Sequence, residues 1–144
     1  MKVRRWLPVG IALCALFTLS TACSEDDSEK LRKVSECGNF VFPDDVNLIW
    51  YRREVMTGDA IAEAVVDIPA AGIEEFKQRS VLSKFDPGVP PRWRESFWQG
   101  SGQDDLLASE AGNIHLVEPN QTPPRWVVLH DNGSDARVFV RAAC

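Results

Sequence analysis

His130 and the residues after it have the types that hydrolytic chemistry uses. Asp131 follows this histidine directly, and Ser134 comes three residues later. A serine nucleophile, a histidine base and an orienting carboxylate make up a hydrolytic triad. The chain has no Gly-x-Ser-x-Gly elbow to expose such a serine. Asp, Asn, Gly and Ser between two apolar runs are typical of a tight turn. We therefore interpret residues 131–135 as a turn that joins two strands.

A second acidic group lies in the irregular segment 81–112. Asp104 and Asp105 follow a stretch of glycine and serine, and paired carboxylates can perform acid–base catalysis. The same pattern is typical of a first helical turn, here leading into two leucines, and we favour that interpretation. The alternative is an envelope hydrolase with its site in segment 81–112. It would use Asp104, Asp105 or His115.

An aromatic cluster in the same segment offers a different function. Trp93, Phe97 and Trp98 lie close together in the sequence, beside Arg92 and Arg94. Exposed tryptophans can stack on sugar rings or anchor a protein partner. The other interpretation is that these rings cover an open face of a sheet. For a domain this small we favour the second interpretation, and the five residues form the binding surface that the first interpretation predicts.

The sequence indicates no metal site and no cofactor. Zinc sites use paired cysteines or closely spaced histidines, whereas this chain has no Cys-x-x-Cys and only two histidines. Asp131, Asn132 and Asp135 do not follow the spacing of a calcium-binding EF-hand. The glycines near residue 100 are not followed by the Gly-Lys-Ser/Thr that a phosphate-binding loop needs.

The four cysteines have three predicted roles: one lies in a segment that is cleaved, one carries the lipid anchor and two form a disulfide. Cys14 lies in an apolar N-terminal run, and Cys23 comes just after that run. Cys37 and Cys144 remain, and two cysteines of an exported chain are expected to form a disulfide. The bond would close a loop of about 100 residues, for which the chain-entropy model gives roughly 4.7 kcal/mol of stabilisation.

The N-terminus has the organisation of an export signal. Three basic residues precede a short apolar run, and small residues precede Cys23. The apolar run is shorter than the roughly 20 residues that span a bilayer, so we expect residues 1–22 to be cleaved. Residues 19–23, Leu-Ser-Thr-Ala-Cys, resemble the lipobox of bacterial lipoproteins. The resemblance implies acylation of Cys23 and attachment to the outer face of the cell membrane, or to a periplasmic or outer-membrane surface.

The charge of the mature chain restricts its partners. Cleavage removes three of the 16 basic residues, which leaves 13 against 21 acidic ones and a net charge of −8. Nucleic-acid binding needs a positive surface, so we expect no nucleic-acid partner. The same charge disfavours electrostatic docking on anionic lipid, and the membrane contact is expected to depend on the lipid on Cys23.

The remaining sequence predicts one small α+β domain over residues 37–144, after an acidic tether over residues 23–36. Alternating apolar residues indicate strands, and Pro69, early glutamates and late basic residues indicate one helix that ends near Arg79. Two apolar runs around the 131–135 turn favour a hairpin. We expect an antiparallel sheet of about five strands with one helix on a face, closed by the disulfide. The predicted strands span residues 46–55, 60–68, 114–117, 125–130 and 137–142.

The function that these features favour is a binding or interaction module of the cell envelope, held at the membrane by its lipid. Its ligand would be another envelope protein or a cell-wall component. No named family is recognised over residues 37–144, so no functional residue is inferred by resemblance.

Overall fold

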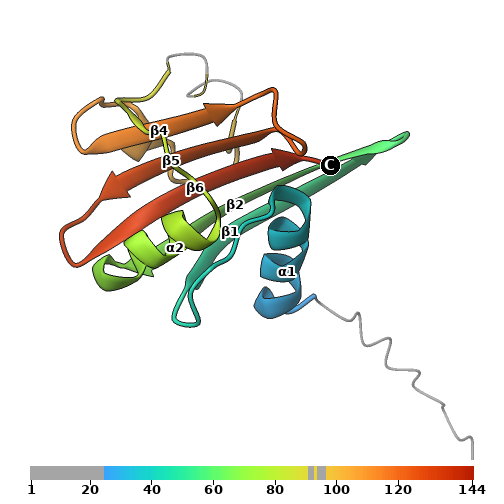
Figure 1. The fold of residues 1–144 in the computed structure, drawn as a ribbon, viewed down its shortest axis with the longest axis horizontal. Helices are drawn as coiled ribbons and strands as arrows, with labels where there is room; N and C mark the ends of the chain where they lie inside the picture. Colours follow the sequence, from blue (N-terminus) through green and yellow to red (C-terminus); the bar gives the residue numbers. More distant parts are fainter. Residues whose placement is uncertain (1–24, 91–92, 94–96) are drawn as a thin grey trace, which may run out of the picture.

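The computed structural model describes residues 25–90, 93 and 97–144 (Figure 1). Within these residues, two α-helices, two short 3-10 turns and six strands follow one another along the chain. In order they are α1 (Asp27–Gly38), β1 (Asn47–Met56), β2 (Asp59–Pro69), η1 (Ala70–Gly72), α2 (Ile73–Arg79), β3 (Asp86–Pro87), η2 (Asp104–Leu107), β4 (Asn113–Glu118), β5 (Arg125–Asp131) and β6 (Asp135–Ala143).

The strands form one antiparallel sheet in the order β1-β2-β6-β5-β4-β3. The expected α+β fold with an antiparallel sheet is therefore confirmed. The sheet has six described strands rather than about five, because a two-residue strand pairs with β4 at the edge. That strand contains Pro87, which lacks an N–H and is depleted in strands, so the sequence carries no strand signal there.

Helix α1 corrects the expected tether. Asp26 caps the helix by accepting a hydrogen bond from the Glu29 N–H at 2.8 Å, and Asn39 ends it in a left-handed conformation. Val34 is fully buried against the sheet. The domain therefore begins at Asp27 rather than at residue 37, and the structure has two α-helices rather than one. Cys23 lies outside the described residues.

The two helices lie on the same face of the sheet, which we call the helix face (Figure 1). Helix α2 forms where the sequence predicts a helix, and its Phe76 is fully buried. The Phe76 ring stacks on Phe42, with the ring centroids 5.4 Å apart. Alternate residues of the central strands, among them Val66 of β2 and Val138 of β6, complete this core.

The opposite side of the sheet, which we call the loop face, has a second core. Val65, Val128 and Phe139 alternate along their strands with residues of the first core, so they point the other way. They pack with Trp93, Trp98, Leu107 and Val89 from the segment between β3 and β4. The sheet is thus covered by the two helices on one side and by described residues of the segment between β3 and β4 on the other.

The expected disulfide and the expected hairpin are confirmed. The sulfur atoms of Cys37 and Cys144 lie 2.07 Å apart, so the end of α1 is bonded to the last residue of the chain. Strands β5 and β6 pair antiparallel, with Asp131 opposite Ala136. The Asp131 carboxylate accepts a hydrogen bond from the Gly133 N–H at 2.7 Å, which is the turn geometry that the sequence indicates.

Candidate functional site

The predicted binding surface is corrected by the burial of its tryptophans. Trp93 is 1% exposed and Trp98 is fully buried, so neither ring can stack on a ligand. The Trp98 indole N–H donates to the Val140 carbonyl at 3.0 Å, and its ring meets Phe139 edge-on with centroids 5.6 Å apart. Phe97 is partly buried against this core, and Arg92 and Arg94 lie outside the described residues. The rings cover the sheet, which is the interpretation that we favour from the sequence.

Beneath these rings, the loop face contains a network of charges. Glu63 is 1% exposed and accepts hydrogen bonds from Arg52, at 2.7 Å from Nε, and from Arg141. The Arg141 guanidinium lies 4.2 Å from the centroid of the Phe97 ring. A buried carboxylate needs such partners, because removing a charge from water is costly. The two arginines bind both carboxylate oxygens of Glu63, so we assign this network a structural role.

A second ion pair extends the network along β2 and β6. Asp67 lies opposite Arg137 in the pairing of β2 with β6, and both carboxylate oxygens accept from that guanidinium at 2.7 Å. Hydrogen bonding to the carboxylate raises the pKa of Arg137 above its ordinary value. Gln103, from the covering segment, accepts from the same arginine and ties that segment to the sheet.

The residues that an enzyme would use are held in other contacts. His115 Nδ1 lies 2.7 Å from the Gly88 carbonyl, and His130 Nδ1 lies 3.1 Å from the Asn113 side-chain oxygen. Asp104 accepts from Ser101 beside it and, with Asp105, begins the 3-10 turn η2, as the helical-turn interpretation expects. In the described part of the chain, no group of three or more His, Cys, Asp or Glu side chains is arranged to hold a metal ion.

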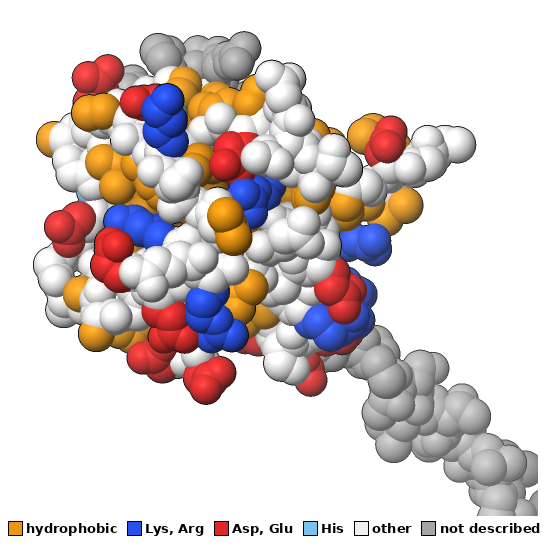
Figure 2. All heavy atoms as spheres, in the orientation of Figure 1, with side chains coloured by type: hydrophobic (Ala, Val, Ile, Leu, Met, Phe, Trp, Pro, Cys, Tyr) orange, Lys and Arg blue, Asp and Glu red, His pale blue; other side chains and the backbone are white. Residues whose placement is uncertain are grey.

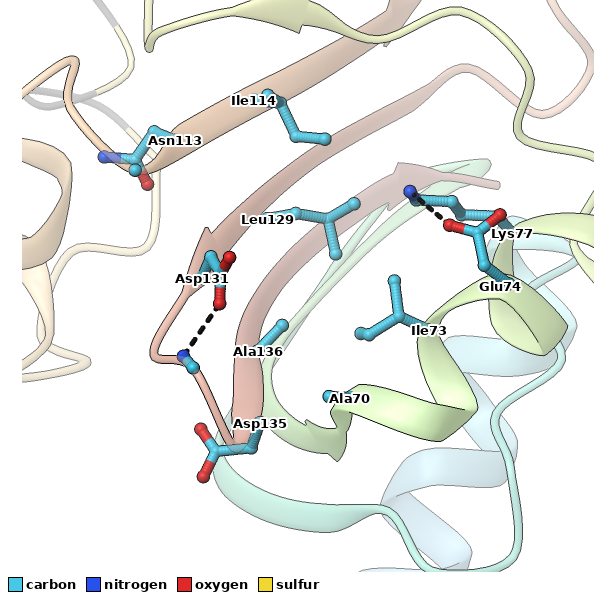
Figure 3. A pocket seen from close by; sticks show the side chains of 12 residues that line it. Ala70, Ile73, Glu74, Lys77, Asn113, Ile114, Leu129, Asp131, Asp135 and Ala136 are labelled. Atoms are coloured by element: carbon cyan, nitrogen blue, oxygen red, sulfur yellow. Dashed lines mark hydrogen bonds and ion pairs between the residues drawn. The ribbon is translucent and has the colours of Figure 1, made fainter.

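The feature that best fits a binding site is a cleft on the helix face, with a volume of about 490 Å³ (Figure 3). It lies between α2 and the ends of β4, β5 and β6. Ile73 from the helix and Leu129 from β5 point into it from opposite sides, and Ile114 of β4 stands beside Leu129. The cleft therefore has aliphatic walls contributed by three separate elements.

Backbone contacts hold the two sides of this cleft together. The Ala70 N–H donates to the Ser134 carbonyl at 3.1 Å, which joins the start of the helical segment to the β5–β6 turn. The Asp131 N–H donates to the Gly112 carbonyl at 3.0 Å, which joins that turn to the start of β4. The cleft is thus preformed by the fold rather than by loose side chains.

The rim of the cleft has more negative than positive side chains. Figure 3 shows Asp131 and Asp135 at the turn end, and Glu74 with Lys77 on the helix. Lys77 and Glu74 form an ion pair at 2.8 Å. The two aspartates accept hydrogen bonds from neutral groups of their own turn, the Gly133 N–H and the Asn132 and Ser134 side chains. Neither aspartate forms a described ion pair, although the charge of Asp135 contributes to the raised pKa of Arg137.

Sequence reasoning did not find this cleft, because its walls come from segments far apart in the chain. The sequence signal that lies in it is the 131–135 turn, which we interpreted only as a connection. In the described residues, no helix is both long and apolar enough to span a membrane. Comparison with models of known protein families, with curated protein sequences and with solved structures finds no match for this chain.

Proposed function

We propose that this chain is a lipid-anchored binding module of the cell envelope, and that the cleft between α2 and the β5–β6 turn holds its ligand. The observation that carries the proposal is the combination of aliphatic walls with two aspartates that form no described ion pair, in one preformed hollow. Ligand sites are commonly concave and mostly apolar, with a few polar groups that fix orientation, and they measure about 300–1,000 Å³.

The charges of the rim indicate the class of ligand. Glu74, Asp131 and Asp135 face one lysine, so the titratable side chains of the cleft carry two more negative than positive charges. An apolar group seated between Ile73 and Leu129 would have a positive group beside the aspartates. We therefore expect an amphipathic cationic ligand, such as a segment of an envelope protein with leucine and lysine side chains.

The proposed location depends on the lipid. The lipobox-like residues 19–23 support acylation of Cys23, and α1 begins at Asp27, so the anchor would lie a few residues from the folded domain. Lipid chains contribute about 0.8 kcal/mol per buried methylene, and more than one chain gives stable attachment. The domain would then be held close to the membrane surface, where other envelope proteins are available.

A pair of peptides of opposite charge tests the ligand class. The probes are ten-residue peptides of alternating lysine and leucine, or of alternating glutamate and leucine, each with a fluorescent label. Fluorescence anisotropy with the mature protein should give tighter binding of the lysine peptide. Equal affinity for the two peptides would contradict the proposed role of the rim.

Isosteric substitutions locate the binding. The double variant Asp131→Asn, Asp135→Asn removes both charges and keeps one acceptor oxygen at each position. At residue 135 the second oxygen, which accepts from the Ser134 hydroxyl, is replaced by an amide nitrogen. Two charge contacts of about 0.2–1 kcal/mol each correspond to a rise in Kd of about 2- to 30-fold. The control, Asp44→Asn with Asp45→Asn, changes the net charge equally at exposed positions that do not line the cleft. An equal loss in the control would show that binding is not at the cleft.

A further inference from the structure

The two edges of the sheet are unequal. One edge is β3, a strand of two residues that ends in proline, and such short edges resist pairing with another chain. The other edge is β1, a strand of ten residues that pairs only with β2 among the described strands. In Figure 1 the β1–β2 hairpin projects beyond the rest of the sheet.

The β1 edge also carries exposed apolar side chains. Five large hydrophobic residues are exposed in the described part of the chain, and Ile49, Val55 and Met56 of this one strand are three of them. Val55 is 70% exposed and Met56 is 52% exposed. Figure 2 shows hydrophobic and charged side chains along the projecting hairpin. An exposed strand edge with apolar side chains is a template for strand addition.

The backbone groups of this edge can be placed from the pairing. Ala60 lies opposite Val55 in the β1–β2 ladder but exchanges both backbone hydrogen bonds with Cys144, on its other side. Partners in an antiparallel pair alternate between hydrogen-bonded and non-hydrogen-bonded positions. The N–H and C=O of Val55 therefore point away from β2. The backbone groups of Arg53 and Tyr51 point away from β2 for the same reason. The alternation is unbroken from Tyr51 to Val55, because the irregularity in the register lies between Leu48 and Trp50.

We propose that the free edge of β1 pairs antiparallel with β1 of a second copy of this chain, with Arg53 on the two-fold axis. This register places Arg52 of each copy opposite Glu54 of the other. It also places Tyr51 opposite Val55 and Trp50 opposite Met56, twice each. The outward backbone groups of residues 51, 53 and 55 then meet as hydrogen-bonded pairs.

The side chains of the strand are complementary in this register. Glu54 is 54% exposed, and its described ion contact is a 3.6 Å approach to Arg52 of its own chain. Opposite charges and aromatic–aliphatic pairs across strands are stabilising, whereas the central Arg53 pair opposes association. Two charge pairs and four apolar pairs outweigh that single repulsion. The exposed Val55 and Met56 become covered by Tyr51 and Trp50 of the other copy.

The geometry agrees with attachment of both copies to one membrane. A two-fold axis perpendicular to the sheet keeps both helix faces on the same side of the joined sheet. Helix α1 packs on that face in each copy. The lipids proposed on the two Cys23 residues can therefore enter the same bilayer. The pairing itself uses β1 alone and does not depend on the cleft or its ligand.

Single cysteine substitutions in the full-length chain, expressed in cells, test this register. Hydrogen-bonded antiparallel partners lie about 5.5 Å apart between Cα atoms, a distance that a disulfide can span. Arg53→Cys should therefore give a disulfide-linked dimer on a non-reducing gel. Val55→Cys is the matched control on the same exposed edge, because two Val55 residues would lie about 13 Å apart along the strands. Mass spectrometry of the band identifies the linked residues.

The possible results distinguish pairing of β1 with a second copy of this chain from its pairing with a different protein. A 53–53 link that is absent or minor in Val55→Cys supports pairing of two copies. Equal linkage of both variants, no linkage of Arg53→Cys, or its linkage to a different protein would overturn the proposal. Adding Glu54→Lys to Arg53→Cys should lower the dimer yield by about fivefold or more, since attraction across the strands becomes repulsion. Adding Glu110→Lys, far from β1, should leave the dimer yield of Arg53→Cys unchanged. An equal fall in yield with Glu54→Lys and with Glu110→Lys would also overturn the proposal.

Discussion

Replacement of Trp98 tests whether its ring stabilises the fold or binds a ligand. The side chain is fully buried, its N–H donates to the Val140 carbonyl at 3.0 Å, and its backbone has a positive φ of 56°. A left-handed conformation is unfavourable for a residue with a Cβ, so the packing of the ring must hold it there. Trp98→Phe keeps the Cβ and much of the ring but loses the hydrogen bond. Trp98→Ala also leaves a cavity between Phe139 and Trp93.

The expected costs follow from these contacts. Loss of one hydrogen bond and part of a ring should lower the free energy of unfolding by about 1–2 kcal/mol in Trp98→Phe. Removal of the whole buried ring should lower it by about 3–5 kcal/mol in Trp98→Ala. Equilibrium unfolding in urea, followed by far-ultraviolet circular dichroism with the disulfide intact, measures both values.

The same variants must retain ligand binding while they are folded. Anisotropy with the lysine–leucine peptide, below the unfolding transition, should give a Kd close to that of the unmodified protein, because Trp98 lies on the loop face and the cleft lies on the helix face. The reasoning fails if Trp98→Ala leaves the free energy of unfolding within 0.5 kcal/mol of the original, a change typical of surface substitutions. It also fails if binding is lost in a variant that is stably folded.

Three other changes have defined expectations. Cys37→Ser with Cys144→Ser should lower the free energy of unfolding by up to about 4.7 kcal/mol in urea titrations, since the bond closes a long loop; unchanged stability would contradict this. Cys23→Ala should move the protein out of the detergent-extractable membrane fraction, and retention there would exclude the lipid as the anchor. Hydrogen bonds from Glu29 N–H and Ser28 lower the pKa of Asp26, so its stabilisation of α1 should be lost as the pH falls through that pKa. Asp26→Asn should remove this part of the acid dependence of circular dichroism, and an unchanged profile would argue against the cap.

The sheet could be predicted from the sequence because its strands carry local signals. Residues 126–129 form an apolar run, and Arg137 and Arg141 alternate with Val138 and Val140 after the turn. Each pattern depends only on neighbours in the chain. Helix α1 gave a weak signal, because one fully buried side chain, Val34, and the disulfide hold it to the sheet. Both contacts are with residues distant in sequence.

The candidate site could not be predicted for a similar reason. The burial of Trp93 and Trp98 depends on which face of the sheet their segment crosses, and local composition does not determine that face. The cleft needs Ile73, Ile114 and Leu129 together, although they come from three elements. Asp131 and Asp135 are recognisable as turn residues, but their role at the rim depends on the helix opposite them.

The central claim, that the cleft binds an envelope ligand, is tested most directly by photo-crosslinking in intact cells. A photoreactive benzoylphenylalanine would replace Ala70, an exposed residue on the rim of the cleft, in the full-length chain. The same residue at Asp45 is the control. We expect a discrete crosslinked product from position 70 that is absent from position 45 and falls severalfold in the Asp131→Asn, Asp135→Asn variant. No product, or a product that forms equally from position 45 or without the two aspartates, would contradict the account.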